Sequence, residues 1–227
     1  YSHPISEVTG LKRLKYHRDK PYEKYVPYYK VYEANDSTFI PDFYIVEKQC
    51  DDVINRLKAN NIAMTLISDP GTVLLGRYKV LNFMSPKKPY EGHFLHSNIE
   101  KEISLIYKYF KPGDVFIKTN QKNKRFLVSV LEPDTPDSYF AWNLFDSYVQ
   151  QKEHFSSYVF EDMALEILAK NESLRIEFEE KKESDESFRK SSRAQLDFIY
   201  KRSKYYEPTH NYLPIYSGMD EKGDVEE

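Results

Sequence analysis

Two spacings of hydrophobic residues divide this chain. From residue 35 to 136, short apolar runs bounded by turn residues predict a strand-rich region that contains one helix. From 137 to 216, apolar residues recur every three or four positions and predict a helical region. Residues 1–34 mix prolines, tyrosines and basic residues and form a linker with an edge segment, and 217–227 form an acidic tail. The pattern therefore predicts four regions of different structure.

The strand-rich region begins with the apolar run 43–46, which predicts a strand. Val53, Ile54 and Leu57 then recur at helical spacing and predict a helix from about 47 to 60. Gly76 interrupts a long apolar run and predicts a β-bulge. Further strands are predicted at 62–67, 73–83, 92–98, 103–109, 115–119 and 126–131, the last two as a hairpin.

The predicted fold class is α+β. Residues 24–32 predict an edge strand, because Pro27 has no N–H to donate inside a sheet. In the helical region, Asn171, Asp185 and either Ser156 or Ser157 are candidate N-caps. We expect a strand-rich layer, resembling a small β-sandwich, with one inserted helix and a C-terminal cluster of about four helices packed on it.

Composition narrows the function classes. The 227 residues are 40% hydrophobic and 30% charged, which is typical of a globular chain, and the net charge of -3 argues against nucleic-acid binding. No run of 18 apolar residues occurs, so no membrane span is predicted. The single cysteine, Cys50, excludes an intrachain disulfide, and the spacing shows no histidine partner that would make it a nucleophile. The 20 tyrosines suit half-buried sheet faces and, as the alternative, a binding surface.

His93 and His96 are the sharpest candidates for a metal site. On a helix, two histidines three residues apart share a face and can bind one metal. Gly92 and the β-type neighbours instead predict a strand, on which these two side chains point to opposite faces. We therefore assign no metal ligand and no cofactor, and we interpret both rings as hydrogen-bonded.

The familiar catalytic motifs are absent from the sequence. No histidine has a glutamate three positions later, and His-Glu-x-x-His does not occur. The seven glycines are not spaced for a nucleophile elbow, a dinucleotide-binding turn or a phosphate loop. No catalytic residue can be assigned.

Other polar and aromatic groups have structural and functional interpretations. Five carboxylates near aromatic residues could belong to a glycan site, although turn and cap roles fit their positions better: Asp134, Asp137, Asp146, Glu161 and Asp162. The aromatic cluster 140–145 predicts a core seam in which Trp142 is largely buried, with a ligand platform as the alternative. The basic stretch 201–206, with Arg189, Lys190 and Arg193 before it, is interpreted as a surface face.

Several sequence blocks, in order, carry a resemblance to a known family. They include Pro89-Tyr90-Glu91-Gly92-His93, Pro112-Gly113-Asp114-Val115, Phe126-Leu127-Val128, Leu131-Glu132-Pro133, Asp137-Ser138-Tyr139-Phe140-Ala141-Trp142-Asn143, Tyr158-Val159-Phe160-Glu161-Asp162 and Ala194-Gln195-Leu196-Asp197-Phe198-Ile199-Tyr200. From about residue 25 to 216, the chain resembles the region downstream of the peptidase domain in bacterial, often exported, zinc-carboxypeptidase-like proteins.

The resemblance implies an accessory role. The peptidase domain of that family binds zinc through His-x-x-Glu and a distant histidine, and none of those positions has a counterpart here. Because the chain begins at Tyr1, we expect either a peptidase domain before it in a longer protein, which would be the zinc carboxypeptidase, or a stand-alone relative. The implied location is periplasmic or extracellular.

Three functions follow as hypotheses. The first is a non-catalytic accessory region that stabilises, orients or covers a peptidase domain of the same polypeptide. The alternative is a binding module for a glycan or peptide through exposed aromatic residues, and the third is a hydrolase with a dispersed site. A broad apolar patch would favour the first, a shallow aromatic groove the second, and a deep pocket with convergent titratable groups the third.

Overall fold

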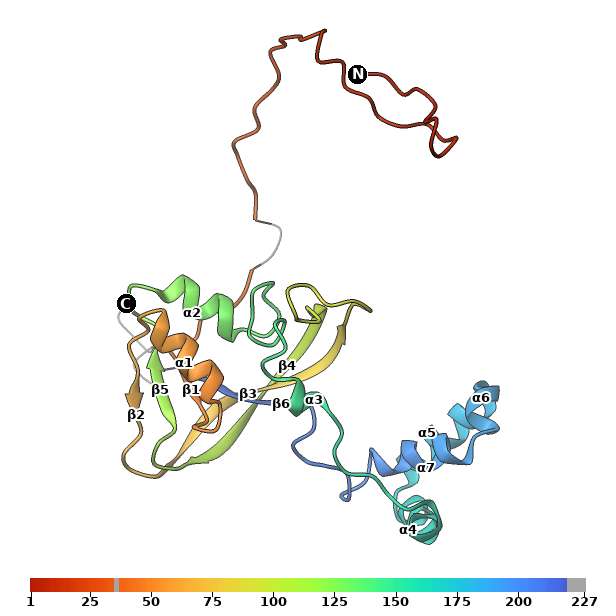
Figure 1. The fold of residues 1–227 in the computed structure, drawn as a ribbon. Coiled ribbons are helices and arrows are strands. Elements are labelled where there is room, and N and C mark those ends of the chain that lie inside the picture. Colours follow the sequence, from red (N-terminus) through yellow and green to blue (C-terminus); the bar gives the residue numbers. More distant parts are fainter. Residues whose placement is uncertain (35–36, 220–227) are drawn as a thin grey trace. The chain divides into compact units, whose positions relative to one another are not determined.

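The computed structural model describes residues 1–34 and 37–219, and it separates into two units, Tyr1–Ser37 and Thr38–Glu227 (Figure 1). Most of the predicted acidic tail, 220–227, lies outside the described residues. Each unit is considered by itself below.

The first unit contains a small closed loop and an irregular segment. Isolated β-bridges join Ser2 to Lys15 and Ile5 to Lys12, and the Ser6 hydroxyl accepts hydrogen bonds from the backbone in the turn. The predicted edge strand at 24–32 is wrong, because these residues have no regular secondary structure. A single strand needs a hydrogen-bonded neighbour to be stable, and no strand of this unit supplies one within the described residues.

One antiparallel sheet forms the centre of the second unit, with strand order β2-β5-β1-β6-β3-β4 (Figure 1). The strands are β1 Phe43–Val46, β2 Thr65–Leu66, β3 Gly71–Met84, β4 Ser97–Phe110, β5 Val115–Lys118 and β6 Tyr212–Gly218. The α+β fold class is confirmed. A single sheet replaces the predicted sandwich in the described residues. The strand predicted at 103–109 lies within β4, whereas the strand predicted at 92–98 is wrong for 92–96, because β4 begins at Ser97.

The strand β1 lies near the middle of the sheet and is buried on both faces. Tyr44 and Val46 join the main hydrophobic core, whereas Phe43 and Ile45 join a smaller cluster with Tyr216 on the opposite face. Successive side chains of a strand point to opposite faces, so an unbroken apolar run is typical of a strand covered on both sides.

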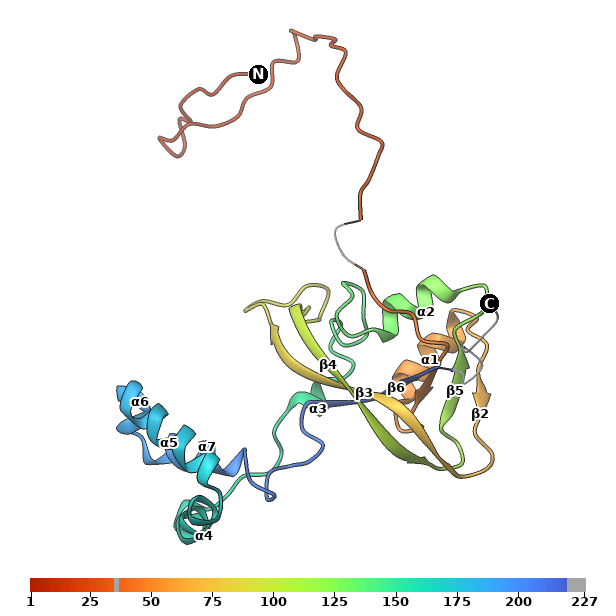
Figure 2. The ribbon, with the colours of Figure 1, turned by 180° about the vertical axis from the view of Figure 1, so that it is seen from behind.

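Two helices, α1 (Asp51–Ala59) and α2 (Lys124–Leu131), cover the main core, as views from the front and from behind show (Figures 1 and 2). The predicted strand at 126–131 is wrong, because these residues belong to α2. Leu127, Val130 and Leu131 are buried at helical spacing. The residues from 126 to 131 are nearly all apolar and partly β-branched, so the sequence pattern also fits a strand. The helix leaves Arg125 and Ser129, which are four residues apart, on a face that is not buried in the main core.

Gly76 has a packing role rather than the predicted bulge. It pairs in regular register with Leu105 on β4 and Ser217 on β6. A Cβ atom at this position would lie 2.8 Å from both the Ile103 side chain and the Ser217 hydroxyl, so only glycine fits. The register irregularities of β3 lie further on, between Arg77 and Met84.

The chain returns to the sheet at its C-terminal end. The prediction that residues up to 216 are helical is wrong here, because β6 lies between β1 and β3. Pro214 argues against a central strand because it has no N–H for the ladder. The β3–β6 pairing is interrupted at this point, between Tyr212 and Tyr216, which accommodates the proline.

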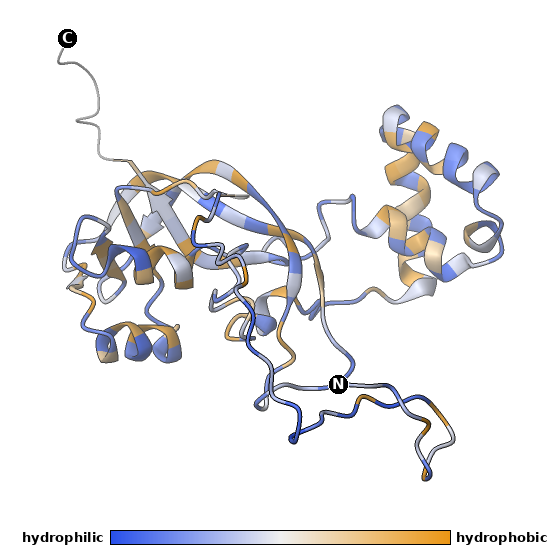
Figure 3. Cartoon of the chain, turned by 90° about the horizontal axis from the view of Figure 1, so that it is seen from above, coloured by the Kyte–Doolittle hydropathy of each residue, from blue (hydrophilic) through white to orange (hydrophobic). Residues whose placement is uncertain are grey.

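Helices α4 to α7 form a cluster with its own hydrophobic core. Their bounds are α4 Ser157–Lys170, α5 Glu172–Ser184, α6 Glu186–Arg189 and α7 Ser192–Tyr200. The short helix α3, Asp146–Val149, precedes them in the chain. Phe160, Phe178 and Phe198 belong to a cluster separate from the cores of the sheet, and Figure 3 shows apolar positions gathered where these helices meet. The predicted N-caps Asn171 and Asp185 are confirmed, since each side chain accepts a hydrogen bond from a backbone N–H of the helix that follows. None of the helices in the described part of the chain has the length and apolar content needed to cross a bilayer.

Candidate functional site

A cavity of about 690 Å³ lies between α1, α2 and the loop that follows α2. Arg56 comes from the last turn of α1, and Arg125 comes from the first turn of α2. The lining consists of Arg56, His93, Arg125, Phe126, Ser129, Val130, Asp137, Tyr139, Trp142 and Leu144. Arg125, Phe126, Ser129 and Val130 line this space from α2, and Val130 and Phe126 also contact the main core.

Two guanidinium groups give the cavity its chemical character. Within residues 1–34 and 37–219, no carboxylate forms an ion pair with Arg56 or Arg125. Guanidinium groups bind carboxylates and phosphates through two parallel hydrogen bonds, and a partly enclosed site strengthens such bonds. Asp137 is the acidic member of the lining. The arrangement can therefore hold an anionic group.

Aromatic side chains form the apolar part of the wall. The edge of one ring meets the face of the other where His93 and Trp142 touch, with centroids 5.6 Å apart and planes at 79°. Trp142 is partly buried, but it lines the cavity and belongs to none of the core clusters of the described residues, so the predicted place in a core seam is wrong for it. Its neighbours Phe140 and Phe145 are fully buried and fill the core seam in its place.

Tyr139 brings a buried hydroxyl to the cavity wall. The residue is 7% exposed, and its hydroxyl has no hydrogen-bond partner in the described part of the chain. Burial raises the pKa of Tyr139 to about 12, although the positive charge of Arg56 acts to lower it. A buried hydroxyl without a partner costs free energy, so a ligand acceptor placed beside it would remove that cost.

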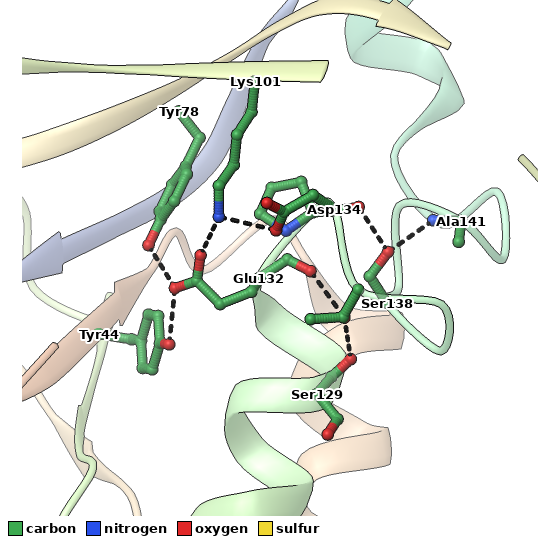
Figure 4. Close-up of polar contacts among 10 residues, drawn as sticks. Tyr44, Tyr78, Lys101, Ser129, Glu132, Asp134, Ser138 and Ala141 are labelled. Atoms are coloured by element: carbon green, nitrogen blue, oxygen red, sulfur yellow. Dashed lines mark hydrogen bonds and ion pairs between the residues drawn. The ribbon is translucent and has the colours of Figure 1, made fainter. Parts of the chain in front are cut away.

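A buried polar network lies at the C-terminal end of α2 (Figure 4). Glu132 is 2% exposed, and its Oε1 accepts hydrogen bonds from the hydroxyls of Tyr44, at 2.8 Å, and Tyr78, at 2.7 Å. The Lys101 ammonium pairs with the other carboxylate oxygen and lies 2.8 Å from Asp134. These contacts join the end of α2 to β1, β3 and β4.

Two further side chains shape the loop between α2 and Trp142 (Figure 4). The Thr135 hydroxyl donates to the backbone carbonyl of Ser129 at 2.5 Å and also contacts that of Glu132 at 2.9 Å. The fully buried Ser138 donates to the carbonyl of Pro133 at 2.8 Å and accepts from the N–H of Ala141 at 3.0 Å. The loop that carries Tyr139 and Trp142 is thus held by internal hydrogen bonds.

His96 joins a serine and an aspartate, as in a hydrolase triad. Its Nδ1 lies 2.8 Å from the Ser85 hydroxyl, and its Nε2 lies 2.9 Å from Asp146. The Asn143 amide also reaches Nε2, at 3.1 Å, and the ring is 6% exposed. A nucleophilic serine needs a substrate site beside it, and the cavity is lined by other residues. We interpret this chain of contacts as a clamp between the end of β3 and the start of α3.

The two histidines considered as metal ligands have separate environments. His93 lies in a turn that bridges back to Tyr90, and His96 precedes β4, so the predicted shared strand is wrong. In residues 1–34 and 37–219, no three His, Cys, Asp or Glu side chains gather closely enough to hold a metal.

The carboxylates considered for a glycan site are not brought together. Asp134 pairs with Lys101, Asp146 contacts His96, and Asp137 lines the cavity. Glu161 and Asp162 lie on α4, among the helices of the C-terminal cluster. Asp137 is therefore the only member of this set at the cavity.

Cys50 and the basic stretch do not add to the site. Burial raises the pKa of the Cys50 thiol to about 12, so the reactive thiolate is scarce at neutral pH. Lys201 pairs with Asp197 at 2.7 Å, and Arg202 pairs with Glu177 at 2.9 Å. These ion pairs fit a solvated helix surface.

Among the lining residues, sequence reasoning did not single out Arg56, Arg125, Ser129 and Val130. The spacing of Leu127, Val130 and Leu131 is the signal that could have found part of the set. Read as a helix, it places Arg125 and Ser129 on the face away from the core.

We expect iodide to quench the fluorescence of Trp142 more strongly than caesium does. Trp142 is the single tryptophan of the sequence, so the emission reports on the cavity alone. The two guanidinium groups raise the local concentration of an anion and lower that of a cation, by roughly twofold or more. Stern–Volmer constants at matched ionic strength, each divided by the constant of free N-acetyltryptophanamide for the same ion, measure the ratio. Replacing Arg56 and Arg125 by glutamine should remove the preference, and equal normalised constants for the two ions would contradict this description of the cavity.

Comparison of the chain with protein-family models, with curated proteins and with solved structures finds no match.

Proposed function

We propose that this chain is a non-catalytic accessory region of a zinc-carboxypeptidase-like protein and that its cavity binds a peptide or glycan through an anionic group of the ligand. One observation carries the binding role: Arg56 and Arg125 come from different helices, face one cavity, and have no carboxylate partner in the described part of the chain. The proposal assigns no catalytic residue.

The sequence resemblance supports the accessory part of the proposal. Five of the ten lining residues lie in blocks that carry the resemblance. These residues are His93, Phe126, Asp137, Tyr139 and Trp142. The proposed setting is an exported protein in which a peptidase domain of the same polypeptide is the partner.

The lining residues indicate which part of the ligand would make polar contacts and which part would make apolar contacts. A charge-assisted hydrogen bond contributes about 1.5–3 kcal/mol, so the two guanidinium groups provide most of the affinity for an anion. The Trp142 ring offers a flat apolar surface to a sugar face or a peptide side chain. Asp137 disfavours ligands that carry a second negative charge nearby.

Titrations followed by Trp142 fluorescence test the proposal. N-acetylphenylalanine and N-acetylphenylalaninamide share the ring and the amide and differ in the carboxylate. Glucuronic acid and glucose form the same comparison for a sugar. We expect the acid of at least one pair to change the emission saturably and its neutral partner to bind at least tenfold more weakly, the ratio that corresponds to about 1.4 kcal/mol.

Variants separate the cavity from general charge effects. Arg56→Gln and Arg125→Gln should each weaken binding of the acid by about tenfold. Arg175→Gln is the control, because Arg175 lies on α5 and pairs with Glu172. The proposal fails if acid and neutral probes bind alike, if none of the four probes binds at millimolar concentration, or if the control variant weakens binding as much as the cavity variants.

A further inference from the structure

The outer edge of β4 is a long strand edge without a partner in the described residues. β4 has 14 residues, pairs with β3 on one side, and ends the strand order of the sheet. Natural edge strands are usually protected by prolines, by charged residues or by short length. β4 contains no proline, and its middle, 103–107, has the uncharged sequence Ile-Ser-Leu-Ile-Tyr. This edge is open to pairing with another strand.

An apolar face accompanies the open edge. Every second residue of β4 from 103 to 109 is apolar or aromatic and exposed, and Leu74 lies beside them on β3, opposite Tyr107. We call this surface the β4 patch: Leu74, Ile103, Leu105, Tyr107 and Tyr109. Leu105 is 74% exposed and Tyr107 is 77% exposed, values that are unusual for large apolar side chains on adjacent positions of one face.

We infer that β4 pairs edge to edge with β4 of a second copy of this chain, antiparallel, with Leu105 opposite Leu105 on the two-fold axis. In this register, Ile103 of each copy lies opposite Tyr107 of the other, so apolar side chains meet on the patch face. The pairing joins the two sheets into one and provides hydrogen-bond partners for the open backbone of both edges. It is symmetric, as a two-fold interface requires.

Charge complementarity selects the second copy and the register. With Leu105 on the axis, Glu102 of each copy faces Lys108 of the other, and no like charges are opposed from 100 to 110. Glu102 already lies opposite Lys79 on β3, so the pairing places it between two lysines. Lys108 donates to Glu47 at 2.6 Å, and its side chain remains 31% exposed.

Other registers lose the pairing of Glu102 with Lys108. A shift of one residue moves the apolar side chains to the opposite face of the partner strand. A shift of two residues in either direction places Glu102 opposite Ile106 or Phe110, although one of these shifts pairs Glu100 with Lys108 instead. The register with Leu105 on the axis therefore combines apolar contact on one face with opposite charges on the other.

Light scattering after size-exclusion chromatography of the whole chain tests the pairing. We expect twice the chain mass of 27.0 kDa at tens of micromolar, and we expect Leu105→Lys to elute as a monomer, because it brings two lysines together on the axis. Leu165→Lys is the matched control, since Leu165 is 70% exposed on α4. Circular dichroism and Trp142 emission identify any variant that fails to fold.

A disulfide tests the register independently. Leu105→Cys should form a disulfide-linked dimer under mild oxidation, because directly opposed residues of antiparallel strands lie within the Cα distance that a disulfide spans. Leu165→Cys should remain a monomer, and the native Cys50 is buried. A monomeric wild-type chain at 100 micromolar overturns the inference, and so does a dimer that survives Leu105→Lys or a Leu105→Cys chain that does not cross-link.

Discussion

Replacing Glu132 by leucine is expected to lower the free energy of unfolding by about 3–5 kcal/mol, the cost typical of breaking a buried ion pair from one side. The carboxylate is enclosed and accepts two tyrosine hydroxyls and the Lys101 ammonium. Leucine has a similar size but removes the acceptor of the Tyr44 and Tyr78 hydroxyls, at a cost of about 1–3 kcal/mol for Tyr44 and less for Tyr78, which keeps its contact with the Ser217 hydroxyl. Urea unfolding at neutral pH, followed by circular dichroism, measures the loss.

Two further variants identify the cause of that loss. Glu132→Gln keeps an acceptor for the hydroxyls and removes the charge, so it should cost about half as much as Glu132→Leu. The double variant Lys101→Met, Glu132→Leu should lose less stability than the sum of the two single variants. Each single variant leaves one charge of the pair buried, whereas the double variant removes both. In the Glu132→Leu variant, Lys101 still pairs with Asp134, and this remaining ion pair reduces the expected departure from additivity. A Glu132→Leu chain as stable as the wild type would contradict the network.

The network also connects stability to the cavity. Glu132 follows the last residue of α2, and Arg125 lies near the first. Loss of the contacts to β1, β3 and β4 would free the end of the helix and the loop that carries Trp142. The Glu132 variants should therefore weaken binding of the acidic probes as well as lower stability, although Glu132 does not line the cavity.

The sequence pattern correctly predicted those elements whose signal lies within a few neighbouring residues. The strand at 43–46 is confirmed, and the helix predicted from about 47 to 60 is α1, at Asp51–Ala59. Both have a signal that is complete within a few residues: an unbroken apolar run for the strand and a repeated spacing for the helix. The helix caps Asn171 and Asp185 are local in the same way, because a side chain bonds to a backbone N–H three residues later.

The misassigned elements depend on tertiary context. The run 126–131 is apolar enough for a strand, and only its packing against α1 and the sheet selects the helix. β6 contains Pro214, which counts against a central strand unless the neighbouring ladder is interrupted there. Neither choice can be made from the segment alone.

The candidate site could be predicted least. Arg56 and Arg125 are 69 positions apart in the numbering and meet at one cavity because two helices pack side by side on the sheet. The partners of Glu132 come from three strands. His93 and Trp142 were singled out from sequence, but their contact with each other was not, because it depends on how two loops approach.

Stability is expected to fall steeply above pH 10, and Tyr44 and Tyr78 are the largest single contributors. Burial, reinforced by the negative charge of Glu132, raises the pKa of both hydroxyls well above the usual value for tyrosine. In the unfolded chain, both ionise near pH 10. Above that pH, the unfolded chain binds fewer protons than the folded chain, so the free energy of unfolding decreases by about 1.4 kcal/mol per pH unit for each tyrosine. Below pH 10, this contribution is fully present.

Phenylalanine variants isolate the two hydroxyls. Tyr44→Phe and Tyr78→Phe each lose a hydrogen bond to Glu132 and should be less stable at pH 8. Each should also lose less stability between pH 10 and 11 than the wild type, by about 1 kcal/mol, because a tyrosine of the unfolded chain is only partly ionised in this range. Tyr158→Phe is the control, because Tyr158 is exposed on α4, and its slope should match that of the wild type. Other tyrosines with raised pKa values, such as the buried Tyr139 and the partly buried Tyr148, add to the slope of every variant alike. Urea unfolding at pH 8, 10, 10.5 and 11 gives the slopes. If Tyr44→Phe and Tyr158→Phe have the same slope, the Tyr44 hydroxyl ionises with the chain still folded, and the enclosed network around Glu132 is not present in solution.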